Sequence, residues 1–185
     1  TGATFVGHVE ADAYACKTLK TRTAYWNLKK ENKLHLYNDY LLKKITTEEL
    51  WNVGGVTSSN DVINTMISDD TFDDITKTVR KNLKAKNLKN VDLIIGGPPC
   101  QAYSIIGRAR MKEAVACDPR NFLYRYYVRF LTTFKPKMFI FENVPGLKSA
   151  GNGKYFEDLK QAIDDAGYHI ELEELIASDY GVLQD

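Results

Sequence analysis

One stretch of the sequence, Val91 to Ser104, constrains the fold more than any other. It begins with the apolar run Val-Asp-Leu-Ile-Ile, whose length and β-branched content are typical of a buried parallel strand. The run ends at Gly-Gly-Pro-Pro, which predicts a stiff loop, because glycine permits unusual backbone angles and proline fixes φ. The next residue is Cys100. A lone cysteine is more often buried and inert. Ligands of open α/β sheets, however, bind beyond the carboxyl ends of the strands, so this thiol is a candidate nucleophile.

A second strand pattern ends in an acid. Residues 137–144 read Lys-Met-Phe-Ile-Phe-Glu-Asn-Val and are followed by Pro-Gly, which places Glu142 at a strand end. The segments Gly-Gly-Pro-Pro-Cys-Gln-Ala-Tyr-Ser and Phe-Glu-Asn-Val-Pro-Gly closely resemble the Pro-Cys and Glu-Asn-Val motifs of the cytosine-carbon-5 DNA methyltransferases, in the form found in bacterial modification enzymes. The rest of the chain is therefore compared with that family.

The resemblance implies a covalent mechanism on a cytosine that is flipped out of double-stranded DNA. Cys100 would add to carbon 6, and Glu142 would donate a proton to ring nitrogen 3, with burial at the apolar strand end raising the pKa of Glu142. Carbon 5 would then take the methyl group of S-adenosylmethionine, leaving S-adenosylhomocysteine. The resemblance also implies that the cytosine is contacted by Gln101, Ser104 and Asn143.

The cofactor residues are expected at other strand ends. Residues 4–10 read as a strand that ends at Glu10, followed by a helix over residues 13–19, and this resembles the family's second motif. Glu10 would hold the ribose of S-adenosylmethionine, and Asp74 with Ile75 would receive the adenine. The resemblance adds two further cofactor contacts, Pro99 and Leu123. Asp74 also has a simpler interpretation as the N-cap of a helix over residues 76–88.

The alternation of strands and helices predicts an α/β fold with a doubly wound, mostly parallel sheet, Rossmann-like as in S-adenosylmethionine-dependent methyltransferases. Thr46 and Glu49 form a capping-box pattern, and Ser59 precedes a second expected helix start. Further helices are expected after Asp118 and over residues 155–166, where Gly167 is the C-cap. A strand is expected over residues 168–176.

Basic residues of the helix after Asp74 are interpreted as a solvated face. Residues 103–117 suit an active-site lid.

Residues 24–72 match no family motif and are interpreted as an insertion, and residues 1–185 as a whole are interpreted as part of a catalytic methyltransferase domain. They contain an aromatic and basic stretch: Tyr25, Trp26, Lys29, Lys30, Lys33, His35 and Tyr37. Such a stretch can bind single-stranded nucleic acid by stacking and phosphate contact. The preferred alternative is that the insertion packs its own aromatic side chains.

Composition restricts partners and location. The net charge of +1 gives no global field for nucleic acid. The three cysteines have no metal-ligand spacing and suit a reducing compartment, and no apolar run is long enough to span a membrane. We therefore expect a cytoplasmic bacterial protein without a metal, acting as a monomer or with a second polypeptide.

Several family features are not found in this sequence: the Phe-x-Gly-x-Gly first motif, the closing arginines and the target-recognition domain. We therefore expect the central part of a catalytic domain, inactive by itself. Two alternatives remain open: a methyltransferase that acts on tRNA, and a non-catalytic binding or regulatory homologue.

Overall fold

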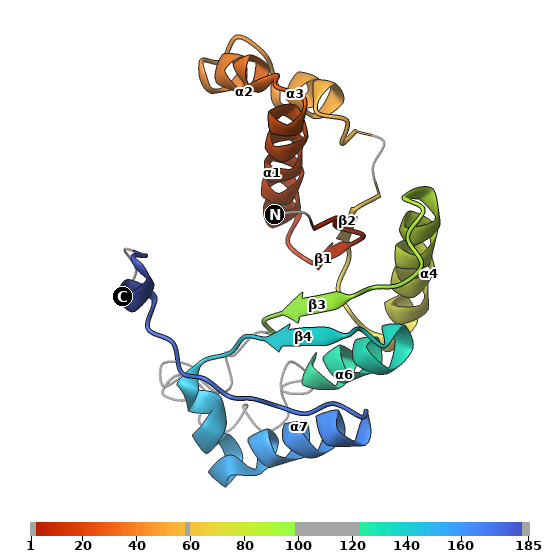
Figure 1. Cartoon of the computed structure of the whole chain (residues 1–185), viewed down its shortest axis with the longest axis vertical. Coiled ribbons are helices and arrows are strands. Elements are labelled where there is room, and N and C mark those ends of the chain that lie inside the picture. The colour runs from red at the N-terminus through yellow and green to blue at the C-terminus, as the bar shows by residue number, and fades with distance from the viewer. Residues whose placement is uncertain (1–2, 58–59, 99–122, 183–185) are drawn as a thin grey trace. The chain divides into compact units, whose positions relative to one another are not determined.

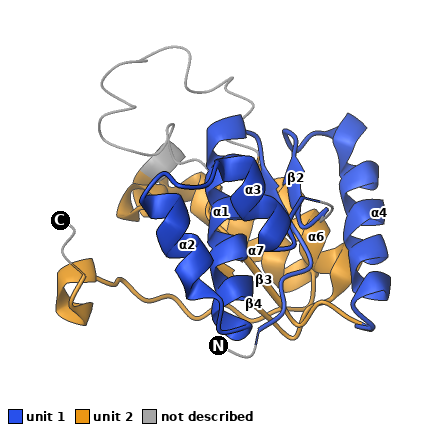
Figure 2. Ribbon diagram, turned by 90° about the horizontal axis from the view of Figure 1, so that it is seen from above, with its two compact units in different colours: residues 1–89 blue, residues 90–185 orange. Residues whose placement is uncertain are grey.

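The computed structural model describes residues 3–57, 60–98 and 123–182, which fall into two compact units, Thr1–Lys89 and Asn90–Asp185 (Figure 2). Each unit contains a two-stranded parallel sheet and helices (Figure 1). The chain is therefore a mixed α/β protein with small parallel sheets. In the described part of the chain, no helix combines the length and the apolar character that crossing a membrane requires.

Unit 1 has a helical half and a strand-containing half. Its elements are β1 (His8–Glu10), α1 (Ala13–Lys30), α2 (Leu34–Leu41), α3 (Thr47–Val53), β2 (Val62–Asn64) and α4 (Asp69–Ala85). Strands β1 and β2 are parallel, with His8 opposite Val62 and Glu10 opposite Asn64. The carboxyl ends of the two strands therefore bring Glu10 and Asn64 together.

The helices of unit 1 begin at side-chain caps. Helix α1 starts after Asp12, whose carboxylate accepts a hydrogen bond from the backbone N–H of Ala15 at 2.7 Å. Helix α3 starts at the capping box of Thr46 and Glu49, as the sequence predicts. The backbone N–H of Thr46 donates to the Glu49 carboxylate, and this bond lowers the pKa of Glu49. Both starts thus follow from local side-chain chemistry.

The described residues of the segment without family motifs, 24–57 and 60–72, form α2, α3 and β2 together with parts of α1 and α4. Helix α1 runs to Lys30, well past the predicted end at residue 19. Helices α1 and α3 and the residues after them form a small core of Ala24, Leu28, Leu50 and Val56. Tyr25 packs edge-on against Trp26 and Tyr37. The contacts agree with the interpretation in which this segment packs its own aromatic side chains.

Two expected helix starts in unit 1 are wrong. Val62 and Ile63 form strand β2 and not a helix, because their β-branched side chains complete a parallel ladder with β1; Ser59 itself lies outside the described residues. Helix α4 begins at Asp69, with Ser68 as N-cap, and not at Asp74. The Ser68 N–H donates to the Thr71 hydroxyl at 3.0 Å, so a threonine takes the place of the Glu or Gln of the usual capping box.

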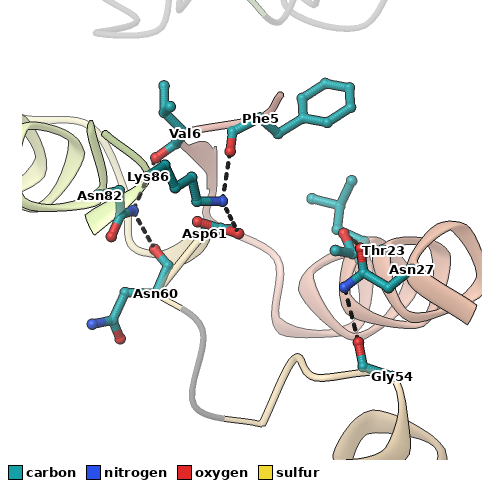
Figure 3. A network of polar contacts seen from close by, with 10 residues as sticks. Phe5, Val6, Thr23, Asn27, Gly54, Asn60, Asp61, Asn82 and Lys86 are labelled. Atoms are coloured by element: carbon teal, nitrogen blue, oxygen red, sulfur yellow. Dashed lines mark hydrogen bonds and ion pairs between the residues drawn. The ribbon is translucent and has the colours of Figure 1, made fainter. Parts of the chain in front are cut away.

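Helix α4 fastens the amino ends of the two strands of unit 1 (Figure 3). The side-chain amide of Asn82 donates to the carbonyl oxygens of Val6 at 2.9 Å and Asn60 at 3.0 Å. The ammonium group of Lys86 donates to the carbonyl of Phe5 at 2.8 Å and pairs with Asp61 at 2.6 Å. Lys86 is therefore an exception to the solvated basic face expected for this helix.

Unit 2 is built around a second parallel strand pair. Its elements are β3 (Leu93–Gly96), α6 (Leu123–Phe134), β4 (Met138–Phe141), the 3-10 helix η2 (Pro145–Gly153), α7 (Lys154–Asp165) and the 3-10 helix η3 (Ala177–Tyr180). Leu93 lies opposite Met138 and Gly96 opposite Phe141. Helices α6 and α7 contribute the buried core residues Tyr124, Tyr127, Leu131, Leu159 and Ile163, which Leu147 joins.

The sequence predicts most of unit 2 correctly. Strand β4 lies within its predicted run, and β3 extends one residue beyond the predicted apolar run, to Gly96. Helix α7 ends before Gly167, whose φ of +84° is the left-handed conformation expected of a glycine that ends a helix. The predicted strand over residues 168–176 is wrong: these residues join no sheet among the described residues. Tyr168 and Ile170 instead pack against the core, and the Tyr168 hydroxyl donates to the carbonyl of Pro136 at 2.7 Å. Alternating apolar residues here mark packing and not a ladder.

Candidate active site and cofactor site

The parallel register of β3 and β4 places two candidate catalytic segments at one edge of the sheet. The backbone N–H of Glu142 donates to the carbonyl of Gly96 at 2.9 Å. The side-chain amide of Asn143 donates to the carbonyl of Pro98 at 3.2 Å, and its Oδ1 accepts from the N–H of Val144 at 2.9 Å. The start of the loop that leads to residue 100 is thus bonded directly to the Glu-Asn pair.

The two glycines at the end of β3 serve close packing and not unusual backbone angles. Positive φ angles among the described glycines occur at other positions in the chain, not at Gly96 or Gly97. A β-carbon on Gly96 would lie 2.8 Å from the ring of Tyr127, and one on Gly97 would lie 2.5 Å from Oε2 of Glu142. The Glu142 carboxylate therefore rests against the backbone of the loop.

Helix α6 supports both strands through one side chain. The hydroxyl of Tyr127 lies 3.1 Å from the carbonyl oxygen of Ile94 on β3 and 2.9 Å from that of Ile140 on β4. One phenolic proton is thus within reach of an acceptor on each strand. Burial raises the pKa of Tyr127, so the group stays a neutral donor. The ring also packs edge-on against Phe141, next to Glu142.

The environment of Glu142 differs from the sequence-based expectation. Glu142 is exposed, whereas the sequence predicts an acid that is buried at an apolar strand end. Strand β4 alternates, with Phe139 and Phe141 packed on the core while Met138 and Ile140 are exposed, so the strand end is not enclosed on both faces. Four candidate site residues lie outside the described residues: Pro99, Cys100, Gln101 and Ser104.

The expected ribose ligand lies at the carboxyl edge of the other sheet. Glu10 ends β1 and is partly buried. Its Oε1 accepts from the backbone N–H of Asp12 at 2.8 Å. Its carbonyl oxygen accepts from the N–H of Thr65, just beyond β2, at 3.0 Å. A carboxylate at this edge of a parallel pair is chemically suited to accept hydrogen bonds from a ribose.

The other expected cofactor residues are placed differently. Asp74 and Ile75 lie inside helix α4, where Asp74 is exposed and pairs with Lys77 at 3.0 Å, while Ile75 is 1% exposed. Leu123 is the first residue of α6 and is partly buried. The residues that directly follow the strand beside Glu10 are instead Thr65 and Met66. The adenine roles of Asp74 and Ile75 remain predictions that this placement does not support.

Sequence reasoning missed two residues that organise these edges, Asn64 and Tyr127. Tyr127 lies in the helix expected after Asp118, in which Leu123 and not Tyr127 is predicted as a site residue. Asn64 fell in the unassigned segment, and only the register of β1 and β2 places it beside Glu10. The sequence signal that could have indicated Asn64 is its position directly after the pair Val62-Ile63. Among the described residues, no cluster of His, Cys, Asp and Glu could hold a metal ion.

Comparison with known proteins identifies relatives for most of this chain. A family model described as C-5 cytosine-specific DNA methylase matches residues 40–185, which include both strand ends of unit 2 and strand β2 of unit 1. The matched range also contains residues 40–64, within the segment that showed no motif. Sequence similarity to this family thus extends beyond the motif segments.

Individual relatives are named as Type II methyltransferases. The chain is 38% identical over 185 residues to the Type II methyltransferase M.Bpa9945I of Bacillus paralicheniformis, an overlap of 88% of this chain and 40% of that protein. It is 38% identical to M.FnuDI of Fusobacterium nucleatum over 59% of the chain, and 40% identical to M.DdeI of Desulfomicrobium norvegicum over 60%. The matches cover 40%, 31% and 26% of these relatives, so the chain spans less than half of their length.

Proposed function

This chain belongs to the C-5 cytosine-specific DNA methylase family, and from that membership we propose that the full-length protein methylates carbon 5 of cytosine in DNA, as part of a restriction-modification system. One structural observation carries the proposal. The parallel pairing of β3 and β4 bonds the start of the loop before Cys100 to Glu142 and Asn143. A nucleophile that follows this loop start in the sequence, with an acid at the end of the paired strand, suits chemistry on a single ring.

In the proposed reaction, the Cys100 thiolate adds to carbon 6 of a flipped-out cytosine. Glu142 donates a proton to ring nitrogen 3, and the resulting enamine makes carbon 5 nucleophilic. Carbon 5 takes the methyl group of S-adenosylmethionine, leaving S-adenosylhomocysteine, and a base removes the carbon 5 proton. The thiolate then leaves as the double bond between carbons 5 and 6 re-forms, and ring nitrogen 3 returns its proton to the Glu142 carboxylate. We expect the bound base to cover Glu142, because its carboxylate is exposed in this structure.

Glu10 fits the ribose of S-adenosylmethionine, which would supply the methyl group when bound. Glu10 stands at the carboxyl edge of β1, where its carboxylate can accept from ribose hydroxyls. Helix α1, which starts three residues later, fixes the turn that carries this carboxylate. The roles proposed for Asp74, Ile75, Pro99 and Leu123 at the cofactor, and for Gln101, Ser104 and Asn143 at the base, rest on the family resemblance.

We further propose that the two small parallel sheets are parts of one doubly wound, Rossmann-like sheet in the full-length protein. Both pairs are parallel, and both place candidate functional residues at their carboxyl edges, which is the pattern of ligand binding in that fold. Double-stranded DNA would be the partner.

The test is methyl transfer by the full-length protein from labelled S-adenosylmethionine to duplex DNA, with 5-methylcytosine as the measured product. Cys100→Ser should abolish transfer, and with it covalent trapping on DNA that contains 5-fluorocytosine, because fluorine replaces the proton that must leave. DNA binding should persist. A serine variant that still forms the trapped adduct would remove Cys100 from the mechanism.

The same assay separates the alternatives. Transfer to tRNA in place of duplex DNA would identify an RNA-modifying member of this fold. Binding of DNA without any transfer would identify a non-catalytic homologue.

A further inference from the structure

Asn64, the last residue of β2, fixes the backbone at the end of β1. Its Nδ2 donates to the carbonyl oxygens of Glu10 at 3.0 Å and Ala11 at 3.1 Å. The carbonyl of Glu10 also accepts from the N–H of Thr65 at 3.0 Å and from the thiol of Cys16 at 3.4 Å. The residues that carry the proposed ribose ligand are thus held from strand β2, far away in sequence.

The side chain of Glu10 depends on this backbone. Its Oε1 accepts from the N–H of Asp12, and Asp12 in turn caps helix α1 through Ala15. A shift of residues 10–12 would move the donor that orients the carboxylate. Positions of reacting or binding groups must hold within about 0.5 Å to remain productive, so such a shift would be felt at the ligand.

A second asparagine in unit 1 offers a natural control. Asn82 makes the same kind of contact, with Nδ2 donating to two backbone carbonyls, but at the amino ends of β1 and β2 (Figure 3). Asn82 is 6% exposed, whereas Asn64 is an exposed residue. The two asparagines therefore differ in burial and in which end of the strand pair they fasten.

We propose that Asn64 is a positioning residue for S-adenosylmethionine: it holds residues 10–12 so that the Glu10 carboxylate meets the ribose. The inference rests on the proposed function, and it assigns to Asn64 a role through Glu10 and no contact of its own with the cofactor. Because Asn64 is exposed, water can replace its hydrogen bonds in a variant, and the stability of the fold depends little on it. The orientation of Glu10, by contrast, depends on the amide donor.

The experiment compares Asn64→Ala and Asn64→Asp with Asn82→Ala in the full-length protein. Asn64→Asp keeps the size of the side chain and puts an acceptor against two carbonyl oxygens. It should raise the KM for S-adenosylmethionine roughly tenfold, the scale of one well-placed charge-assisted interaction, with the KM for DNA and the melting temperature little changed. Asn82→Ala should lower the melting temperature and leave the KM for S-adenosylmethionine near wild type.

A double-mutant cycle provides the decisive readout. If Asn64 acts through Glu10, then Asn64→Ala should weaken S-adenosylmethionine binding in the wild-type background and have little further effect beside Glu10→Gln. Additive effects in calorimetry, or equal rises in the KM for cofactor and DNA, would overturn the positioning role while leaving methyl transfer intact. A wild-type protein that neither binds nor uses S-adenosylmethionine would overturn the proposed function, and this inference with it.

Discussion

Each unit contains a short parallel strand pair, and different kinds of side chain stabilise the pair in the two units. In unit 1, polar side chains tie the strand pair at both ends: Asn82 and Lys86 at the amino ends, and Asn64 at the carboxyl ends. In unit 2, the aromatic ring of Tyr127 lies under the carboxyl ends of the strands, and its hydroxyl reaches both backbones. A parallel pair of three or four residues makes few ladder bonds, so side chains from helices supply what the ladder lacks.

The two units differ in whether the side chains that stabilise the strand pair lie at the same end of the strands as the candidate functional residues. In unit 1 the buried side chain of Asn82 holds the amino ends of the strands, at the end opposite Glu10. The carboxyl edge that carries Glu10 therefore depends on the exposed side-chain amide of Asn64. In unit 2 the side chain of Tyr127 lies directly beneath the catalytic edge. The start of the loop after β3 is held by the side chain of Asn143 and by a backbone hydrogen bond. We therefore expect chemistry and stability to respond separately in unit 1 and more closely together in unit 2.

The largest effect is expected at Glu142, which contacts the loop but does not carry it. Glu142→Gln keeps the size of the side chain and cannot deliver a proton, so single-turnover methyl transfer should fall by about 10²–10⁴-fold. The melting temperature should stay near wild type, because the bonds that hold the loop come from Asn143 and the backbone. Glu142→Ala serves as the companion variant. A Gln variant that keeps more than about a tenth of the rate, beside an Ala variant that mainly melts earlier, would assign Glu142 a structural role instead.

A smaller effect, on stability alone, is expected at Lys86. Lys86→Met removes a partly buried ion pair and a bond to the Phe5 carbonyl, which should cost about 1.5–3 kcal/mol of unfolding free energy. Lys84→Met, on the exposed side of the same helix, is the control and should change little. Hydrogen exchange localises the effect: protection should fall at residues 8–10 and 62–64 and persist at residues 93–96. Uniform loss of protection in both units would contradict the separate fastening of the two pairs.

The smallest effect is expected at Tyr127. Tyr127→Phe keeps the ring against Gly96 and removes the hydroxyl shared by β3 and β4, which should cost about 0.5–1.5 kcal/mol in a denaturant titration. Because this fastening lies under the catalytic edge, the rate of methyl transfer should fall as well. Tyr180→Phe, at an exposed position in the same unit, should leave both quantities unchanged. Lost stability with an unchanged rate would show that stability and chemistry are separated in unit 2 too.

Much of unit 2 can be predicted from sequence because local signals there agree with the fold. The apolar runs before Gly96 and Glu142 are short, β-branched or aromatic, and bounded by turn residues, so each indicates a strand by itself. Gly167 marks the end of α7 in the same local way. The strand predicted over residues 168–176 is wrong, because apolar residues also alternate with a period of two where an extended segment packs on a core without joining a sheet.

Unit 1 depends more on pairing that no local pattern reveals. Strand β2 is only three residues long, and Val62 with Ile63 fits a helix or a strand equally until β1 lies beside it. The start of α4 uses Ser68 and Thr71, which the capping-box rule does not cover. Asn64 becomes a candidate only through its register with Glu10. Long-range contacts, and not propensity, decided these points.

The glycines at the end of β3 have a consequence for how this family can vary. The ring of Tyr127 occupies the volume that a β-carbon at position 96 would fill. Positions 96 and 127 therefore compete for the same space, so a side chain fits at position 96 only if the residue at position 127 is smaller. Among related sequences, these positions should covary, and a library randomised at both should recover compensating pairs that no single substitution reveals.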